Sequence, residues 1–124
     1  MTPSSLGSEY GQGAAKVLLL DFDHQHAVAL ADRLRSRSLH VDVYADSEAA
    51  IAQLRRSAPE YEVVIINVSI HSVPWLKTLQ KLNEASRRSG AQQRPLLLCV
   101  SMNQQQPEFV LQIERTGARY VRER

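Results

Sequence analysis

The apolar positions of this chain follow two different spacings that alternate along its length. Five short segments rich in apolar residues are separated by longer segments in which apolar residues recur every three or four positions. Short apolar segments predict strands in the interior of a sheet, and the three-to-four spacing predicts amphipathic helices. Strands that alternate with helices favour right-handed crossovers and a parallel sheet covered on both faces.

The pattern predicts five strands and four helices in one domain. The strands are 16–20, 41–45, 61–68, 95–101 and 119–122, and the helices are 25–38, 47 to Pro59, 74–88 and 107–117. Ser47 is the predicted N-cap of the second helix, and Gly117 ends the fourth. The alternation in 41–45 is typical of a strand at the sheet edge. The chain stops before a fifth helix, which would cover the same face as the first.

The central strand 61–68 carries one polar residue at its carboxyl end, Asn67. Open α/β sheets bind their ligands at this edge. Asp21 and Asp23 follow the first strand, so two carboxylates and an amide are predicted to meet there and could form a pocket for a divalent cation. In the alternative interpretation, which we favour, Asp23 caps the following helix and Asp21 is the remnant of an acidic pocket.

Other chemically active residues lack the partners that a catalytic or metal site needs. His24, His26 and His71 could be ligands or phosphate carriers, but no cysteine or carboxylate stands at metal spacing, which favours loop positions. Ser69 and Ser101 lack the glycine-flanked turn of a hydrolase nucleophile. The sequence also has no glycine-rich phosphate loop. We therefore predict neither an enzyme nor a bound cofactor or metal.

Composition narrows the setting more than the function. The chain has 124 residues, of which 44% are hydrophobic and 23% charged, and its net charge is +2. The single cysteine, Cys99, lies in an apolar run, which predicts core packing in a reducing, cytoplasmic compartment. No apolar run is long enough for a membrane span. Residues 1–15 are rich in Ser and Gly and are predicted to form a flexible tail, with the folded domain over 16–124.

The order of these segments resembles the receiver domain of two-component response regulators, the CheY-like family. The resemblance covers roughly 16–124 and implies a flavodoxin-like sheet of strand order 2-1-3-4-5. The residues that carry it are Lys-Val-Leu-Leu-Leu-Asp at 16–21, Leu-x-x-x-Leu at 30–34, Ser-Glu-Ala-Ala-Ile at 47–51, Tyr-Glu-Val-Val-Ile-Ile-Asn at 61–67, Leu-Cys-Val-Ser at 98–101 and Gly-Ala-Arg-Tyr-Val at 117–121.

The resemblance implies a phosphorylation site that has lost its reactive groups. Receiver domains hold magnesium with an acidic pair after the first strand and accept phosphate on an aspartate at the end of the third. Asp21 matches the first acidic position, Phe22 stands at the second, and Asn67 falls on the phosphoacceptor. An amide is a far poorer nucleophile than a carboxylate, and a phenyl ring cannot bind a cation. The resemblance therefore implies a degenerate, or pseudo-, receiver.

Two further family positions couple phosphorylation to a change at the surface. They are a hydroxyl at the end of the fourth strand, which Ser101 matches, and a lysine at the end of the fifth, where Tyr120 nearby is also switch-like. The family's lysine falls on Arg124 when counted from Gly117 and on Glu123 when counted from Tyr120. Neither residue reproduces a lysine in a tight pocket.

The leading hypothesis is a protein-interaction module that works without phosphorylation in two-component signalling or transcriptional regulation. It would dock a protein partner through its last helix and strand, a surface that includes Arg115, Arg119 and Arg122. One alternative is an active phosphorelay receiver that uses Asp23 or a serine after a shift in register. Another is an α/β enzyme of a different family.

Two expectations concern partners. The arginines are scattered over several helices, so direct nucleic-acid binding has little support. A sheet face left open beside the first helix would expose apolar surface, which predicts either a longer parent protein or a homodimer.

Overall fold

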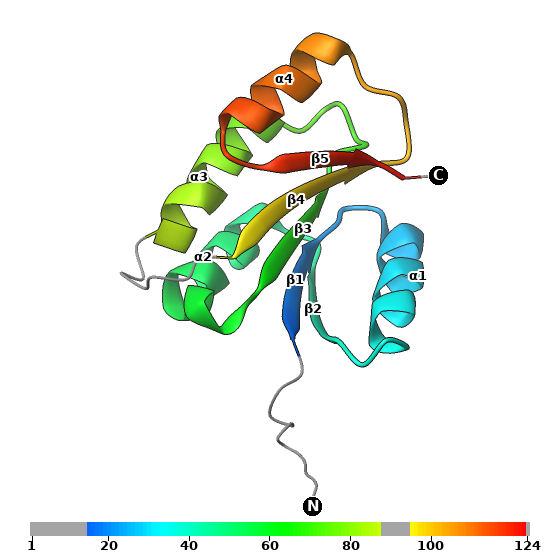
Figure 1. Ribbon diagram of the computed structural model, residues 1–124, viewed down its shortest axis with the longest axis vertical. Coiled ribbons are helices and arrows are strands. Elements are labelled where there is room, and N and C mark those ends of the chain that lie inside the picture. The colour runs from blue at the N-terminus through cyan, green and yellow to red at the C-terminus, as the bar shows by residue number, and fades with distance from the viewer. Residues whose placement is uncertain (1–14, 88–94, 124) are drawn as a thin grey trace, which may run out of the picture.

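The fold is a five-stranded parallel sheet between two unequal layers of helices (Figure 1). The computed structural model describes residues 15–87 and 95–123. The strands are β1 (Lys16–Leu20), β2 (His40–Tyr44), β3 (Val63–Asn67), β4 (Leu96–Ser101) and β5 (Arg119–Arg122). The helices are α1 (His24–Arg35), α2 (Ser47–Ser57), α3 (Trp75–Arg87) and α4 (Pro107–Arg115), with a 3-10 turn, η1 (Ala58–Glu60). No helix among these residues has the length and apolar character needed to cross a membrane.

The strand order is β2-β1-β3-β4-β5, with every neighbouring pair parallel. This confirms the predicted doubly wound α/β class, including the place of β2 at the sheet edge. The α4 helix ends as predicted, because Gly117 adopts a φ of +97° that only glycine reaches without strain. The flexible tail predicted for 1–15 and the loop 89–94 fall almost entirely outside the described residues.

The ends of several elements differ from the predicted bounds. The α1 helix begins at His24 and stops at Arg35, since Ser38 turns the chain with a φ of +67°. The N-cap of α2 is Asp46 and not Ser47, because the Asp46 carboxylate accepts a hydrogen bond from Ala49 N at 3.2 Å. A charged carboxylate at this position also interacts favourably with the helix dipole.

The inner strands bury both of their faces, as their apolar sequences require. Leu18 and Ile66 pack toward α2 and α3 in the larger core, whereas Leu19 and Ile65 pack toward α1 in the smaller one. Cys99 belongs to the larger core and is fully buried. Burial raises the pKa of its thiol to about 12, so the thiol stays protonated and packs as an apolar group.

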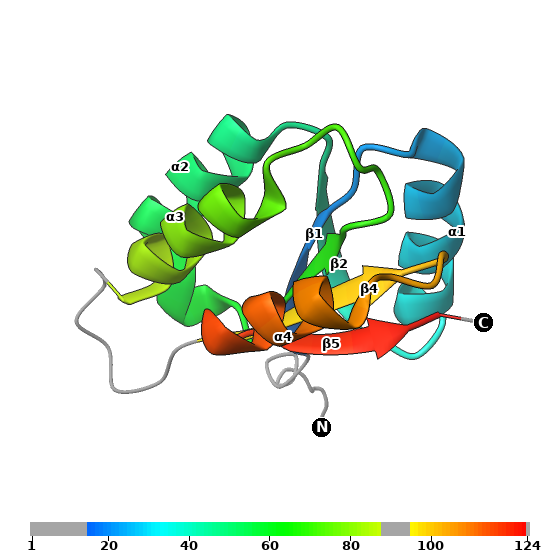
Figure 2. The same cartoon turned by 90° about the horizontal axis from the view of Figure 1, so that it is seen from above.

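The two faces of the sheet are covered unequally (Figure 2). The α1 helix alone lies on one face, while α2, α3 and α4 lie on the other. Leu96 is 40% exposed and Val121 48% exposed, and both belong to the α1 face by strand alternation. An apolar strip beside α1 is thus open over β4 and β5. The homodimer or longer parent predicted for this face stays a prediction.

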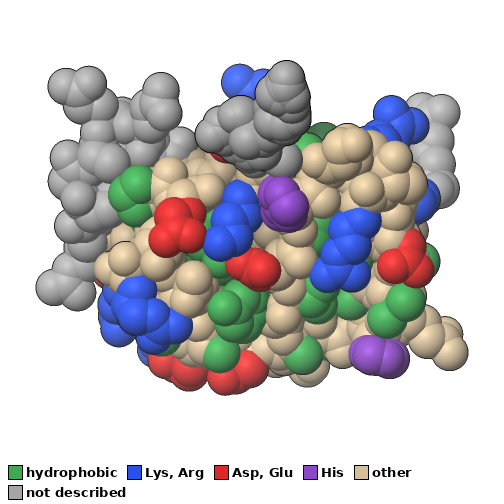
Figure 3. All heavy atoms as spheres, turned by 90° about the horizontal axis from the view of Figure 1, so that it is seen from below, with side chains coloured by type: hydrophobic (Ala, Val, Ile, Leu, Met, Phe, Trp, Pro, Cys, Tyr) green, Lys and Arg blue, Asp and Glu red, His purple; other side chains and the backbone are tan. Residues whose placement is uncertain are grey.

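At the edge of the sheet where the strands begin, basic and acidic side chains are interspersed. Lys16 Nζ lies 3.0 Å from Glu60 Oε1 and 3.7 Å from Asp42 Oδ2, and the hydrogen bond to Glu60 raises the lysine pKa. The Tyr61 hydroxyl donates to Asp42 at 2.6 Å. Figure 3 shows this side of the molecule, where basic and acidic side chains alternate. The described side chains on this side form no continuous basic stripe of the kind that follows a phosphate backbone.

The larger core predicts a large difference between two leucine truncations. Leu79 on α3 is completely buried, whereas Leu111 on α4 is 48% exposed. Leu79→Ala should lower the free energy of unfolding by about 3 kcal/mol, and Leu111→Ala by less than about 0.5 kcal/mol. Urea unfolding followed by circular dichroism measures both. Equal losses from the two variants would contradict the packing described here.

Candidate functional site

The candidate site lies at the carboxyl edge of the sheet, where β1 and the neighbouring β3 end, with the end of β5 beyond β4 at the same edge. Asp21 follows β1 and is 1% exposed, and its backbone N–H donates to Tyr44 O at 2.9 Å. Asp23 is the N-cap of α1 and accepts a hydrogen bond from His26 N at 3.2 Å. This supports the favoured interpretation of Asp23 as a cap. The turn between β1 and α1 is closed further by Asp23 N, which donates to Asp21 Oδ1 at 2.9 Å.

His26, in the first turn of α1, bridges two carboxylates. Its side chain is 8% exposed, with Nδ1 hydrogen-bonded to Asp21 Oδ2 and Nε2 lying 2.5 Å from Glu123 Oε1. An ionised carboxylate only accepts hydrogen bonds, so each ring nitrogen must carry a proton. The two contacts and the raised pKa of His26 therefore favour its cationic form. This imidazolium links the end of β1 to the residue after β5.

The charges of this group balance. Arg33 Nη2 on α1 lies 3.1 Å from Glu123 Oε2, so Glu123 has a cation on each carboxylate oxygen. Two carboxylates thus face one imidazolium and one guanidinium. Burial alone would lower the pKa of His26. The hydrogen bonds to Asp21 and Glu123 raise this pKa by more than burial lowers it, so the net shift is upward.

Asn67 completes the bridge from the centre of the sheet. It is 2% exposed, and its Nδ2 donates to Asp21 Oδ1 at 3.0 Å. Its Oδ1 accepts from Ser69 N at 3.0 Å and from Ser69 Oγ at 2.6 Å. Asn67 Nδ2 also lies 3.4 Å from His26 Nδ1, because both nitrogens approach the same carboxylate. The amide uses its donor side and its acceptor side at once, which a carboxylate at this position could not do.

The residues present do not fit a divalent cation. Asp21 already binds Asn67 and Asp23 N through one oxygen and His26 through the other. Phe22, at the second acidic position, packs against Trp75 with ring centroids 5.5 Å apart. Within 15–87 and 95–123, no three His, Cys, Asp or Glu side chains are arranged to hold a metal ion. The space that a cation would need beside Asp21 is taken by His26.

Ser101 and Ser69 hold two neighbouring loops, and both are hydrogen-bonded to Asn103. Ser101 Oγ donates to Asn103 O at 2.8 Å and accepts from Gln105 Nε2 at 2.9 Å. Ser69 Oγ accepts from Met102 N at 2.9 Å, and Asn103 Nδ2 donates to Ser69 O at 3.2 Å. Among the described contacts none joins Ser101 to Asn67. The Ser101 hydroxyl therefore stabilises the loop after β4.

Tyr120 turns its ring inward toward α4 and the larger core. Its hydroxyl oxygen is buried and has no hydrogen-bond partner in the part of the chain that the structure describes. The three arginines predicted for docking are exposed, but they do not share one face. Arg122 lies on the α4 side of the sheet together with Tyr120, whereas Arg119 lies on the α1 side. Arg115 is the last residue of α4, shortly before β5 begins. The three arginines therefore have only the edge of β5 in common.

Two residues of the site were not expected from the sequence. The sequence favours a loop position for His26, and it offers Glu123 only as one of two residues in place of the family lysine. Counting from Tyr120 identified the position that reaches the site, while Arg124 lies outside the described residues. The usable signal for His26 is its place three residues after a capping aspartate, where a helix side chain lies close to the preceding strand end. His71 is exposed in a loop, as predicted, whereas His24, also exposed, is the first residue of α1 and not a loop residue.

Comparisons with known proteins identify the fold. A scan of protein-family models gives no match, and a search of the curated proteins gives none either. Several solved structures are similar to that of this chain.

The chemotaxis protein CheY4 of Vibrio cholerae has a TM-score of 0.71 and 18% identity, with 87% of this chain and 84% of that chain covered. A chain of the CheX–CheY–BeF3–Mg complex of Borrelia burgdorferi has a TM-score of 0.74 and 17% identity, with 93% and 83% covered. The receiver domain of the histidine kinase CKI1 of Arabidopsis thaliana, in complex with Mg²⁺ and BeF3⁻, has a TM-score of 0.74 and 10% identity, with 87% and 80% covered. The chain has the flavodoxin-like receiver fold.

The His26 bridge predicts a loss of stability as the pH rises. The folded-state pKa of His26 is raised above its usual 6.5, so its contribution is complete below pH 6.5 and is lost as the pH passes the raised value. Urea unfolding over this range should show the decline in the wild-type chain and in His24→Gln, whose histidine is exposed. The decline should be absent in His26→Gln. A decline of the same size in His26→Gln would contradict the bridge.

The unpaired hydroxyl of Tyr120 predicts that its removal stabilises the fold. Tyr120→Phe should raise the free energy of unfolding by about 1 kcal/mol, because a buried hydroxyl without a partner opposes folding. Tyr61 is the matched contrast, since its hydroxyl bonds to Asp42 and accepts from Gln53. Tyr61→Phe should lower the same quantity by about 1 kcal/mol. Thermal and urea unfolding would test the two signs, and a loss of stability in Tyr120→Phe would refute the assignment.

Proposed function

We propose that this chain is a pseudo-receiver, a protein-interaction module whose conformation does not depend on phosphorylation. The observation that carries the proposal is the engagement of Asp21 by both Asn67 and His26. In a working receiver this acidic group would be free to hold magnesium beside a phosphoacceptor. Here an internal cation and an amide occupy it.

Three chemical features support the absence of phosphoryl transfer. Asn67 offers an amide oxygen, which is a poor nucleophile and already accepts two hydrogen bonds from Ser69. Phe22 supplies no ligand, so the metal that would neutralise a phosphoryl group has no second carboxylate. A shifted site at Asp23 is disfavoured, since its carboxylate caps α1.

The docking surface that we propose runs along α4 and the edge of β5. Arg115, Arg119 and Arg122 are exposed, and none of them lies within 4.0 Å of a carboxylate among the described residues. Unpaired guanidinium groups can form bidentate bonds to carboxylates of a partner. The similar chain from Borrelia burgdorferi comes from a complex of CheX with CheY, which supports a protein partner for this fold.

The proposal predicts that acetyl phosphate leaves the chain unmodified. Incubation with acetyl phosphate and Mg²⁺, followed by phosphate-affinity electrophoresis, should give a single unshifted band, while a phosphorylatable receiver treated in parallel gives two. An acid-labile, magnesium-dependent shifted band would refute the proposal. If Asp23→Ala abolished such a band, the phosphorelay alternative would be correct in its place.

A further inference from the structure

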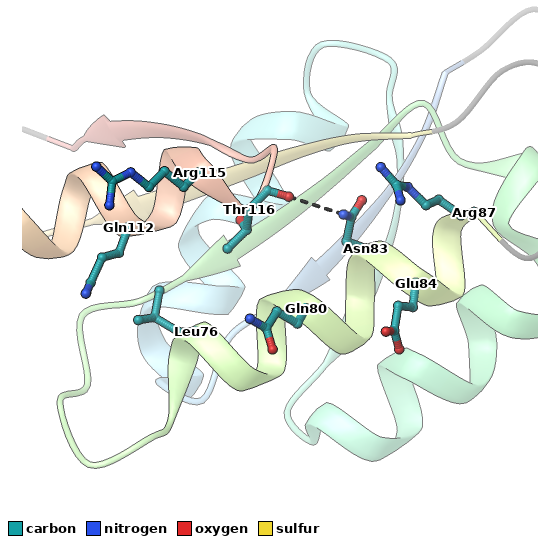
Figure 4. A pocket seen from close by; sticks show the side chains of 8 residues that line it. All are labelled: Leu76, Gln80, Asn83, Glu84, Arg87, Gln112, Arg115 and Thr116. Carbon is teal, nitrogen blue, oxygen red and sulfur yellow. Dashed lines mark hydrogen bonds between the residues drawn. The ribbon is translucent and has the colours of Figure 1, made fainter.

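A groove separates α3 from α4 on the helical side of the sheet (Figure 4). Its volume is about 520 Å³, and it is lined by Leu76, Gln80, Asn83, Glu84, Arg87, Gln112, Arg115 and Thr116. Seven of these eight side chains are polar or charged. The two helices meet at the end of α4, where Asn83 Nδ2 donates to Thr116 O at 3.2 Å. The groove therefore has one fixed contact between its walls.

The amides in the groove have the chemistry of a peptide backbone. Gln80 on α3 and Gln112 on α4 are exposed and have no hydrogen-bond partner within the described segments. Asn83 has committed its amide nitrogen to Thr116 O, which leaves its oxygen to accept. Side-chain amides both donate and accept, so they can pair with the N–H and C=O groups of an extended chain. Leu76 adds a half-buried apolar contact.

Arginines stand at both ends of this amide-lined groove. Arg115 ends α4 and Arg87 ends α3, both are exposed, and neither lies within 4.0 Å of a carboxylate among the described residues. A second hollow of about 280 Å³ continues past Glu84 and Arg87 to Arg55 in the last turn of α2. Arginines at helix ends commonly complement the helix dipole. The dipole does not explain why three of them surround two hollows that share Glu84 and Arg87 in their lining.

We infer that this groove binds an extended acidic segment of a partner protein. Carboxylates of the segment pair with Arg115 and Arg87, and its backbone lies against the amides between them. Glu84 disfavours a nucleic acid, because a phosphate at every nucleotide would place charge against this carboxylate, whereas a peptide can space its acidic residues around it. The inference deepens the proposed function, on which it rests, by naming the chemistry of the partner and adding α3 to the docking surface.

The test uses a short fluorescein-labelled peptide of Glu, Leu and Gly, with a Lys-for-Glu peptide as its control, and measures binding to the full chain by fluorescence anisotropy. The acidic peptide should bind and the basic one should not. Arg87→Glu and Arg115→Glu should each weaken binding by about tenfold, which corresponds to about 1.4 kcal/mol. The matched control is Arg37→Glu, which changes the net charge equally at an exposed position beyond α1. Circular dichroism verifies that each variant is folded.

Each other outcome has a defined meaning. Equal weakening by Arg37→Glu would show that only net charge matters, and the inference would be overturned. Weakening by Arg119→Glu but not by Arg87→Glu would overturn the groove and leave docking through β5 intact. Absence of binding, or tighter binding of an oligouridylate through the same arginines, would overturn the acidic protein partner. Phosphorylation by acetyl phosphate would instead contradict the proposed function, whatever the peptide does.

Discussion

The geometry of a parallel sheet brings the ends of its strands to one edge, and any charges there must be balanced at close quarters. In this chain the edge collects a buried carboxylate after β1, Asp21, and a partly exposed one after β5, Glu123. Leaving Asp21 without a cation would be costly, because a buried unpaired charge is strongly destabilising. His26 supplies the cation from within the chain. Through His26, the turn after β1 and the first helix are also linked to the end of the last strand.

The fold was predictable from the sequence because it depends on spacing. Apolar runs such as 61–68 and the helical repeat of Leu30 and Leu34 specify elements that must be buried, and strict alternation leaves few topologies. The end of a central strand likewise identified Asn67. Its meeting with Asp21 was expected as well, but the contact of His26 with Glu123 was not predictable. His26 and Glu123 are 97 residues apart in sequence, and their contact depends on side-chain directions that no spacing records.

Local competition accounts for the smaller errors. Asp46 and Ser47 are both good caps, and spacing alone does not choose between them, whereas the structure gives the position to the charged side chain. The same limit applies to the three docking arginines. Strand alternation separates Arg119 from Arg122, yet this becomes visible only when the register of β5 against β4 is known. By contrast, Arg55, Arg87 and Arg115 are far apart in the sequence, but each lies in the last turn of its helix, and the fold brings these helix ends near one another.

The hydrogen bonds between the loops after β3 and β4 have a consequence for motion. Ser69 accepts from Met102 N and, through its carbonyl, from the side chain of Asn103. Loops at this edge of an α/β sheet ordinarily fluctuate separately, and their amides exchange hydrogen with solvent at different rates. Here the two loops must open together, because movement of either loop breaks the hydrogen bonds that hold the other. Their amide protons should therefore belong to one cooperative opening unit, with a common free energy of exposure.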